Sequence, residues 1–165
     1  ETGVGCTPTS SMGRLFDAVS ALAGVRQVVA YEAQAAIELE GLSRGVDCGS
    51  DAYAFDVQRE DAMTVIDPAP MLHAVIRDCR AGATAGVIGA RLHRAVAELI
   101  VEVAVAQRDA SPTVALSGGV FQNALLLEST LTGLRAHGID AITHRAVPPN
   151  DGGIALGQLL VGNSQ

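Results

Sequence analysis

One segment of the chain combines glycines and polar side chains in a way that suits a nucleotide. It reads Leu116-Ser117-Gly118-Gly119-Val120-Phe121-Gln122-Asn123. Glycine has no Cβ, so a ligand can approach the backbone closely. A helix that begins here would offer unpaired N–H groups and the positive end of its dipole, and Asn123 carries both a donor and an acceptor for a base or ribose. The segment is neither a Walker A loop nor a GxGxxG fingerprint, and a plain strand-to-helix turn would have the same spacing.

A second segment places a carboxylate beside two glycines after a stiff Pro148-Pro149 pair. It reads Asn150-Asp151-Gly152-Gly153, at the expected start of the last helix. Asp151 could bind a metal ion held near nucleotide phosphates. The alternative is that Asp151 only caps the helix, a contribution of about 1 kcal/mol.

Near the N-terminus, Ser10, Gly13 and Asp17 fall on one face of an expected helix, opposite its apolar stripe. Asp17 could accept hydrogen bonds from ribose hydroxyls, and Gly13 would leave room for the ligand. A solvated polar face would show the same pattern.

A fourth segment repeats this arrangement with Tyr31, Gln34 and Glu38, which share a helical face. Glu38 could serve as a second ribose acceptor. An ordinary surface helix is again the alternative.

The elements that position these segments follow from hydrophobic spacing and from Gly and Pro breaks. Helices are expected over 12–23, 31–42, 70–80, 84–108, 121–136 and 151–161, and strands over 52–58, 63–66, 113–116 and 139–143. The second half thus reads helix, strand, helix, strand, helix, which favours an α/β domain with a parallel element. Gly82, Gly86 and Gly89 are expected to let helices pack closely.

Composition sets further bounds. The 165 residues suit one domain, and 48% are hydrophobic with only two Tyr, three Phe and no Trp, so the core must be aliphatic. The net charge of −7 argues against a nucleic-acid partner. No apolar run reaches the roughly 18 residues that a membrane helix needs, so no membrane partner is expected. Because the chain opens on Glu1 rather than Met, it looks cut from something longer.

Cysteine and histidine placement predicts no complete metal site in this chain. Three widely spaced cysteines do not form a disulfide framework, and reduced thiols in a cytoplasmic protein are expected. No CxxC or HxxxH pair occurs. The histidines are expected to be surface groups or satisfied core groups, and Ser117 lies in no GxSxG elbow.

Taken together, the four segments resemble one family, the HypF carbamoyltransferases. The resemblance rests on 10–19 (Ser-Ser-Met-Gly-Arg-Leu-Phe-Asp-Ala-Val), 31–40 (Tyr-Glu-Ala-Gln-Ala-Ala-Ile-Glu-Leu-Glu), 116–123 and 147–158 (Val-Pro-Pro-Asn-Asp-Gly-Gly-Ile-Ala-Leu-Gly-Gln). Each motif alone is modest, but four in this order with this spacing are specific. Residues 46–112 match less distinctively.

The resemblance implies a helix-rich α/β fold, one half of an actin/Hsp70/sugar-kinase-like (RNase H-like) nucleotide-binding domain. Residues 1–165 would be the C-terminal part of a carbamoyltransferase domain related to the tRNA threonylcarbamoyltransferases (TsaD). In that family, ATP and carbamoyl phosphate give carbamoyl-adenylate. The carbamoyl group then passes to the C-terminal cysteine of HypE, for the cyanide ligands of [NiFe]-hydrogenases. An acylphosphatase-like domain, zinc fingers, a YrdC-like domain and the first half of this domain would lie outside the chain.

Matching motif to motif implies roles for individual residues. No side-chain nucleophile is implied, and Ala33 stands where many relatives are expected to have Gly. The divalent metal ion would be shared with a histidine pair outside this chain. The implied positions are Gly118, Gly119 and Asn123 for adenosine, Gly13, Asp17 and Glu38 for the ribose and phosphates, and Asp151 for the metal.

Two other functions compete with this one. The first is another TsaD-like carbamoyltransferase, acting in antibiotic O-carbamoylation or tRNA threonylcarbamoylation. The block at 10–17 favours HypF, and the acidic charge weakens the tRNA alternative. The second is a non-catalytic half-domain that binds only a nucleotide or a partner protein.

Overall fold

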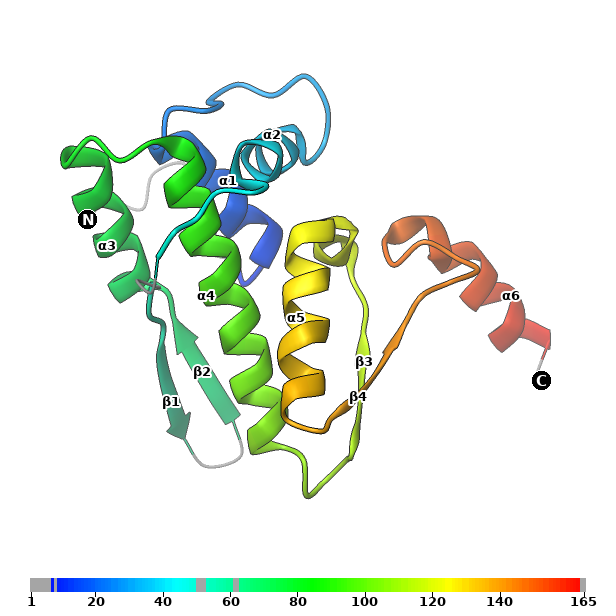
Figure 1. Ribbon diagram of the computed structural model, residues 1–165. Helices are drawn as coiled ribbons and strands as arrows, with labels where there is room; N and C mark the ends of the chain where they lie inside the picture. Colours follow the sequence, from blue (N-terminus) through cyan, green and yellow to red (C-terminus); the bar gives the residue numbers. More distant parts are fainter. Residues whose placement is uncertain (1–6, 8, 50–52, 61–62, 164–165) are drawn as a thin grey trace.

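The computed structural model describes residues 7, 9–49, 53–60 and 63–163 (Figure 1). Two short 3-10 helices, η1 (Gly119–Gln122) and η2 (Asp151–Gly153), precede the last two α-helices. In chain order the other elements are α1 (Met12–Leu22), α2 (Gln34–Ser43), β1 (Asp56–Glu60), β2 (Met63–Asp67), α3 (Ala69–Arg80), α4 (Ala85–Ala106), β3 (Thr113–Leu116), α5 (Ala124–Ala136), β4 (Asp140–Thr143) and α6 (Ile154–Asn163).

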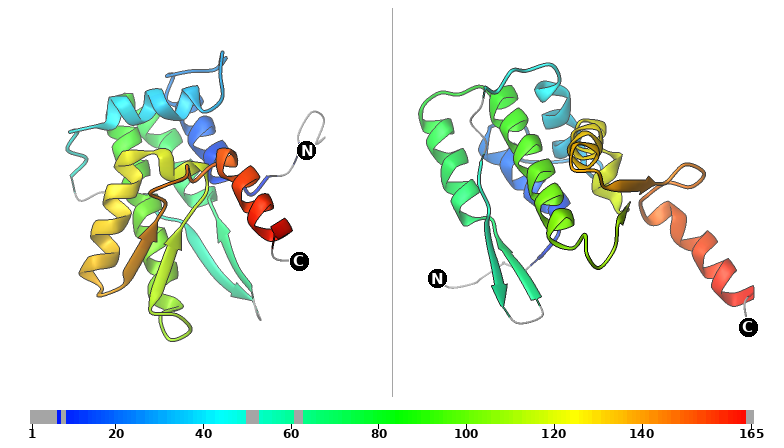
Figure 2. Two further views of the ribbon diagram at one scale, coloured as in Figure 1. Left: turned by 90° about the vertical axis from the view of Figure 1, so that its right-hand side faces the viewer. Right: turned by 60° about the horizontal axis from the view of Figure 1, so that its bottom comes forward.

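The 22-residue helix α4 connects two hydrophobic clusters. Its N-terminal part buries Ile88, Leu92 and Val96 in a cluster to which α1, α2 and α3 also contribute. Further along, Val101 and Ala104 pack with side chains of α5, β3 and β4. Helix α5 lies between α4 and the two short strands, while α6 projects away from the rest of the chain (Figures 1 and 2). This arrangement fixes the start of α5 between the helical layer and the strands.

Strands β3 and β4 pair in parallel, from Thr113 opposite Asp140 to Leu116 opposite Thr143. Helix α5 is the crossover between them, so the predicted α/β organisation with a parallel element is confirmed. Strands β1 and β2 form a separate antiparallel hairpin. Because parallel strands end at the same edge, the segments that follow β3 and β4 are brought together.

Local backbone geometry moves two predicted helix starts. Ala33 adopts a left-handed φ of 61°, so α2 begins at Gln34 rather than Tyr31. An L-residue pays roughly 1–2 kcal/mol in this region, which explains why Gly suits the position. At the other site, Asn123 is extended and its side-chain oxygen accepts from the Leu126 N–H, so α5 starts after Asn123 and not at Phe121.

Close helix packing is confirmed at two of the three predicted glycines. A Cβ on Gly86 would lie 2.6 Å from the Leu42 carbonyl oxygen, and one on Gly89 would lie 2.9 Å from Leu39 Cδ1 and clash with Ser43 Oγ. The prediction for Gly82 is wrong. That residue has a φ of 79° with no neighbour within 4 Å, because it follows the end of α3 in a left-handed turn.

Substitution of a contact glycine should destabilise the chain. Gly89→Ala is expected to lower the free energy of unfolding by about 1–3 kcal/mol, because the methyl group overpacks the α2–α4 contact. Gly41→Ala is the matched control, since nothing lies within 4 Å of its Cβ in α2. It should raise stability by about 0.5–1 kcal/mol through helix propensity. Urea unfolding measures both, and equal shifts for the two variants would contradict the packing account.

Candidate functional site

The four motif segments converge near the N-terminal end of α5. Helix α1, which carries most of the 10–19 motif, contacts η1 in the glycine segment. The Gly118 N–H donates to the Pro149 carbonyl oxygen at 2.9 Å, which joins the glycine loop to the 147–153 loop. From α2, the Glu40 carboxylate reaches the first turn of α5. Segments more than 100 residues apart in sequence therefore form one site.

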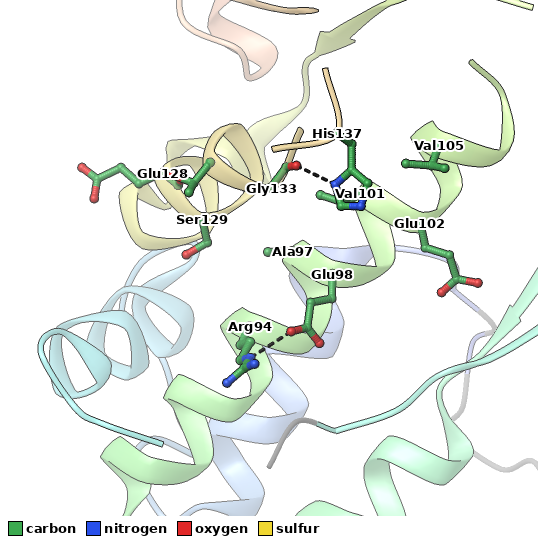
Figure 3. Close-up of a pocket in the computed structure, with 11 residues that line it drawn as sticks. Arg94, Ala97, Glu98, Val101, Glu102, Val105, Glu128, Ser129, Gly133 and His137 are labelled. Atoms are coloured by element: carbon green, nitrogen blue, oxygen red, sulfur yellow. Dashed lines mark hydrogen bonds and ion pairs between the residues drawn. The ribbon is translucent and has the colours of Figure 1, made fainter. Parts of the chain in front are cut away.

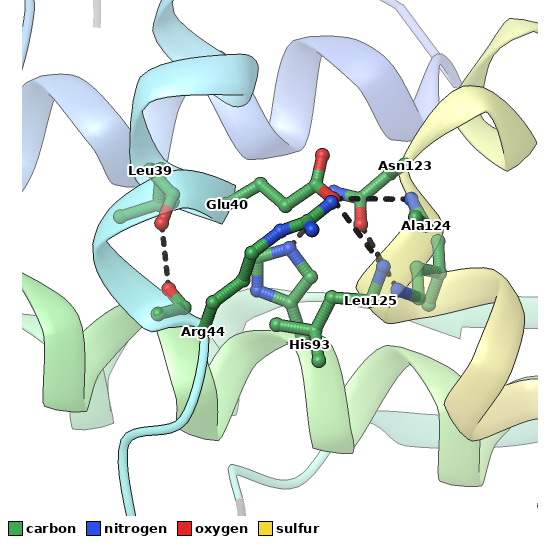
Figure 4. A network of polar contacts seen from close by, with 9 residues as sticks. Leu39, Glu40, Arg44, His93, Asn123, Ala124 and Leu125 are labelled. Carbon is green, nitrogen blue, oxygen red and sulfur yellow. Dashed lines mark hydrogen bonds and ion pairs between the residues drawn. The ribbon is translucent and has the colours of Figure 1, made fainter.

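Glu40 makes the contact that fixes α2 against α5 (Figure 4). Its Oε1 accepts from the backbone N–H groups of Ala124 at 3.1 Å and Leu125 at 3.4 Å, and from Arg44 Nη2 at 2.6 Å. Only 11% of the side chain is exposed. A carboxylate at this position accepts from helix N–H groups that have no partner within the helix. Its negative charge also interacts favourably with the positive N-terminal end of the helix dipole.

His93 of α4 forms a hydrogen bond with Asn123, the residue before α5. Its Nδ1 lies 2.6 Å from the Gly89 carbonyl oxygen and must donate to it, so Nε2 is the acceptor for Asn123 Nδ2 at 2.8 Å. The ring is 1% exposed and meets Phe16 edge-on, with 5.0 Å between ring centroids. Burial lowers the pKa of His93, outweighing the hydrogen bond to Gly89 and the Glu40 charge, so the ring is neutral at pH 7.

Among the described residues, the expected unpaired N–H groups are not found in the first turn of α5, but they are found in η1, directly after Gly118. Ala124 and Leu125 donate to Glu40, and Leu126 donates to Asn123 Oδ1 at 2.9 Å. The Asn123 amide also uses one of its two hydrogens on His93. A ligand at Asn123 would therefore meet the second amide hydrogen, and the residue's adenosine role stays a prediction.

The open backbone lies one turn earlier, at the glycines. Gly118 has a φ of 100° and a ψ of 153°, and no atom lies within 4 Å of a Cβ built on it. A Cβ on Gly119 would lie 3.7 Å from Asn150 Cβ, in the neighbouring loop. In the described part of the chain, neither the Gly119 nor the Val120 N–H has a hydrogen-bond acceptor. Gly118 thus leaves the space that the sequence predicts for close ligand approach.

Asn150, and not Asp151, caps the last helical segment. The Asn150 side-chain oxygen accepts from the Gly152 N–H at 3.0 Å. Asp151 is exposed, and its side chain has no hydrogen bond or ion pair among the described residues. A Cβ on Gly153 would make a tight contact, 3.1 Å from the Pro148 carbonyl oxygen. A cap is therefore not the role of the Asp151 carboxylate, which is free to bind a ligand.

Asp151 fits one position in a metal site and no more. Within residues 7, 9–49, 53–60 and 63–163, no group of three or more His, Cys, Asp or Glu side chains could hold a metal ion. The carboxylate is a suitable oxygen donor for a divalent ion. Further ligands would have to come from outside the described chain.

Asp17 and Glu38, predicted at the ribose and phosphates, are both held by arginines. Asp17 pairs with Arg14 Nη1 at 2.9 Å, one turn away on α1. Glu38 receives Arg26 Nε at 2.9 Å and Nη2 at 2.7 Å, and Gln34 Nε2 at 2.9 Å. The hydrogen bond from Arg26 is the main reason that the pKa of Glu38 is lowered. A ribose hydroxyl would share these carboxylates with their arginines, and both roles stay predictions.

Gly13 lies beside Ser11, the cap of α1. The Ser11 side chain accepts from the Arg14 N–H at 3.4 Å, and a Cβ on Gly13 would make only an ordinary contact, 3.6 Å from Ser11 Oγ. The structure thus provides space at Gly13, as the sequence predicts, but does not show what occupies it.

Sequence reasoning missed Glu40 and the pair formed by Ser117 and His144. His93 is one of the satisfied core histidines that the sequence predicts, although its contact with Asn123 was not foreseen. His144 Nε2 lies 2.9 Å from Ser117 Oγ, where β3 and β4 end side by side. These two residues are 27 apart, so only the parallel pairing brings them together. For Glu40 one signal existed in the sequence, namely the i,i+4 spacing that pairs it with Arg44.

A groove of about 780 Å³ lies between α4 and α5, away from the motif residues (Figure 3). Glu98 within it is paired with Arg94 at 2.8 Å. None of the predicted site residues lines the groove. The residues that line the groove are Arg94, Ala97, Glu98, Val101, Glu102, Val105, Glu128, Ser129, Thr132, Gly133 and His137.

No helix of the described residues is long and apolar enough to cross a membrane.

The chain is similar in sequence to known carbamoyltransferases. Residues 1–158 match the second subdomain of the Kae1-like domain of carbamoyltransferases. The chain is 37% identical over 152 residues to the carbamoyltransferase HypF of Synechocystis sp., covering 92% of this chain and 19% of that protein. It is 39% identical over 151 residues to the carbamoyltransferase HypF of Rhizobium leguminosarum bv. viciae, covering 91% of this chain and 19% of that protein.

Solved structures agree with these matches. A crystal structure of full-length HypF in the phosphate- and nucleotide-bound form gives a TM-score of 0.86 at 39% identity, covering 94% of this chain and 20% of that one. The crystal structure of T. kodakarensis HypF gives a TM-score of 0.81 at 26% identity, covering 97% of this chain and 20% of that one. The chain therefore spans about one fifth of the length of these relatives.

Loss of the Glu40 carboxylate should destabilise the site far more than loss of its arginine partner. Glu40→Ala leaves two helix N–H groups without their acceptor and is expected to cost about 2–3 kcal/mol of stability. Arg44→Ala removes a side chain that is 61% exposed, so it should cost at most about 1 kcal/mol. Thermal or urea unfolding of both variants checks this. Comparable losses would mean that the ion pair, and not the α5 terminus, is the important partner.

Proposed function

The chain belongs to the HypF carbamoyltransferase family, and from this premise we propose that it forms the nucleotide-binding half of a carbamoyltransferase domain. Residues 1–165 are the C-terminal part of that domain, and the protein acts in the cytoplasm. The observation that carries the proposal is the convergence of the four motif segments on η1 and the start of α5, together with the open backbone at Gly118. A relative at 39% identity, described as phosphate- and nucleotide-bound, supports it.

In this proposal ATP lies against the glycine loop. Gly118 and Gly119 approach the adenosine, and Asn123 uses its second amide hydrogen. The ribose and phosphates face Gly13, Asp17 and Glu38, whose arginine partners Arg14 and Arg26 balance their charge. Neutral backbone and paired side chains can hold a nucleotide in a chain of net charge −7 without a basic patch.

The reaction needs a positioned acyl group more than it needs a nucleophile from this chain. Water releases phosphate from carbamoyl phosphate to give carbamate, and a carbamate oxygen then attacks the α-phosphate of ATP, which forms carbamoyl-adenylate and releases pyrophosphate. The thiol of the C-terminal cysteine of HypE then attacks the carbamoyl carbon, loses its proton and releases AMP, for [NiFe]-hydrogenase maturation. Holding both substrates in reacting geometry supplies much of the rate. A divalent metal ion, bound by Asp151 and by histidines outside this chain, would neutralise phosphate charge.

Two alternatives remain as outcomes of the test. A TsaD-like enzyme with another acceptor would form carbamoyl- or threonylcarbamoyl-adenylate and leave HypE unmodified. A non-catalytic half-domain would bind nucleotide or a partner without turnover. Assaying the full-length protein with ATP, carbamoyl phosphate and HypE separates them, because only the proposed function modifies the HypE cysteine.

Filling the open space at Gly118 should weaken nucleotide binding. Gly118→Val in the full-length protein places a branched side chain where the ligand must approach, and we expect ATP affinity to fall at least about tenfold. Gly82→Val is the matched control, because Gly82 also has positive φ and open space but lies outside the site. Calorimetric titration with ATP measures both variants. Unchanged affinity in a folded Gly118→Val protein would remove the loop from the site.

Removing the Asp151 carboxylate should act on the metal and not on the fold. Asp151→Ala in the full-length protein should lower metal affinity by at least about tenfold and carbamoyl transfer with it. Its melting temperature should stay near that of the wild type, because Asn150 supplies the cap. Asp109→Ala, in an exposed loop, is the control. Full metal content and full turnover in Asp151→Ala would end the metal assignment.

A further inference from the structure

We propose that His93 is a positioning residue of the nucleotide site, holding the Asn123 amide in one orientation and with it the start of α5 behind the glycine loop. This inference rests on the proposed function and names a residue that acts through another without touching the ligand.

The geometry places His93 at the junction of three motif segments (Figure 4). Its own helix anchors the ring through Gly89 at 2.6 Å, and Asn123 of the glycine segment donates to Nε2 at 2.8 Å. Phe16, from the α1 motif, packs against the ring with an interplanar angle of 65°. The ring is therefore held by its own helix and by α1 as well as by Asn123.

The contact with His93 determines which way the Asn123 amide group is oriented. An amide can be turned over, which exchanges its oxygen and its NH2 group. Here Oδ1 must face the Leu126 N–H and Nδ2 must face an acceptor, and His93 Nε2 is that acceptor. With both ends fixed, the second amide hydrogen has one direction, which a ligand at the glycine loop can use.

Packing alone does not require an imidazole at this position. The surrounding cluster is aliphatic and aromatic, and a phenylalanine would fill similar space without burying ring nitrogens. A buried polar group is costly unless it is hydrogen-bonded, and both nitrogens of His93 are. What the imidazole adds over an apolar ring is the acceptor for Asn123.

Protonation would remove this acceptor, because Nε2 would then carry a hydrogen pointing at the Asn123 NH2 group. The charged group that faces the ring is Glu40 of α2, which Arg44 and the α5 N–H groups already hold. From α1 the ring meets Phe16, and from α5 it meets Asn123. Because burial lowers the pKa of His93, the acceptor is intact at neutral pH and is lost only as the pH falls below the ordinary histidine value of about 6.5.

The test is ATP titration of the full-length protein by calorimetry, with His93→Phe and His93→Gln beside the wild type. His93→Phe keeps the ring but removes the acceptor, and ATP affinity should fall about tenfold at pH 7.5. His93→Gln can place an amide oxygen near the Nε2 position, so it should stay within about threefold of the wild type. As the pH falls below the ordinary histidine pKa of about 6.5, the wild type should progressively lose affinity, and His93→Gln should lose less.

Several outcomes overturn the inference. Equal ATP affinity for folded His93→Phe and wild type would reduce His93 to a core residue, even if the melting temperature falls. If His93→Phe does not fold, identical pH profiles for His93→Gln and wild type would sink the idea. A wild-type protein that binds no ATP defeats the proposed function as well, which separates the two failures.

Discussion

The N-terminal end of one helix, α5, is the constraint on which the rest of this structure depends. Helix α5 begins in a partly buried position, and its first N–H groups need acceptors that the helix cannot supply. Glu40 from α2 and Asn123 from the preceding turn provide them. Because Asn123 is in turn bonded to His93, the start of α5 is tied at once to α2 and α4. Three helices are thereby fixed around a single point.

This arrangement changes how the site can work. A helix terminus with free N–H groups would attract phosphates directly. Here the Glu40 carboxylate already occupies that end and neutralises its partial positive charge. The ligand-facing backbone is displaced to Gly118 and Gly119, in the loop before the helix. The Gly118 N–H also donates to the Pro149 carbonyl oxygen, which joins this loop to the last motif. The terminus of α5 thus acts as the support of the site and the glycines as its surface.

Sequence patterns were sufficient for the elements and for most motif neighbourhoods. Apolar spacing located α4 within two residues at each end, and the Thr113–Leu116 strand in full. It could not locate interactions set by tertiary contact. The choice between Glu38 and Glu40 depends on which side of α2 faces α5, and Ser117 meets His144 only through strand pairing. The left-handed Ala33 was likewise visible only as a missing glycine.

The central claim is that nucleotide binds where the four segments converge. Hydrogen–deuterium exchange of the full-length protein, with and without saturating ATP, tests it most directly. We expect ATP to slow exchange in 10–19 and 117–123, with residues 85–106 of α4 and the β1–β2 hairpin unchanged. Protection confined to other parts of the protein, with 117–123 exchanging at the same rate in both states, would contradict it.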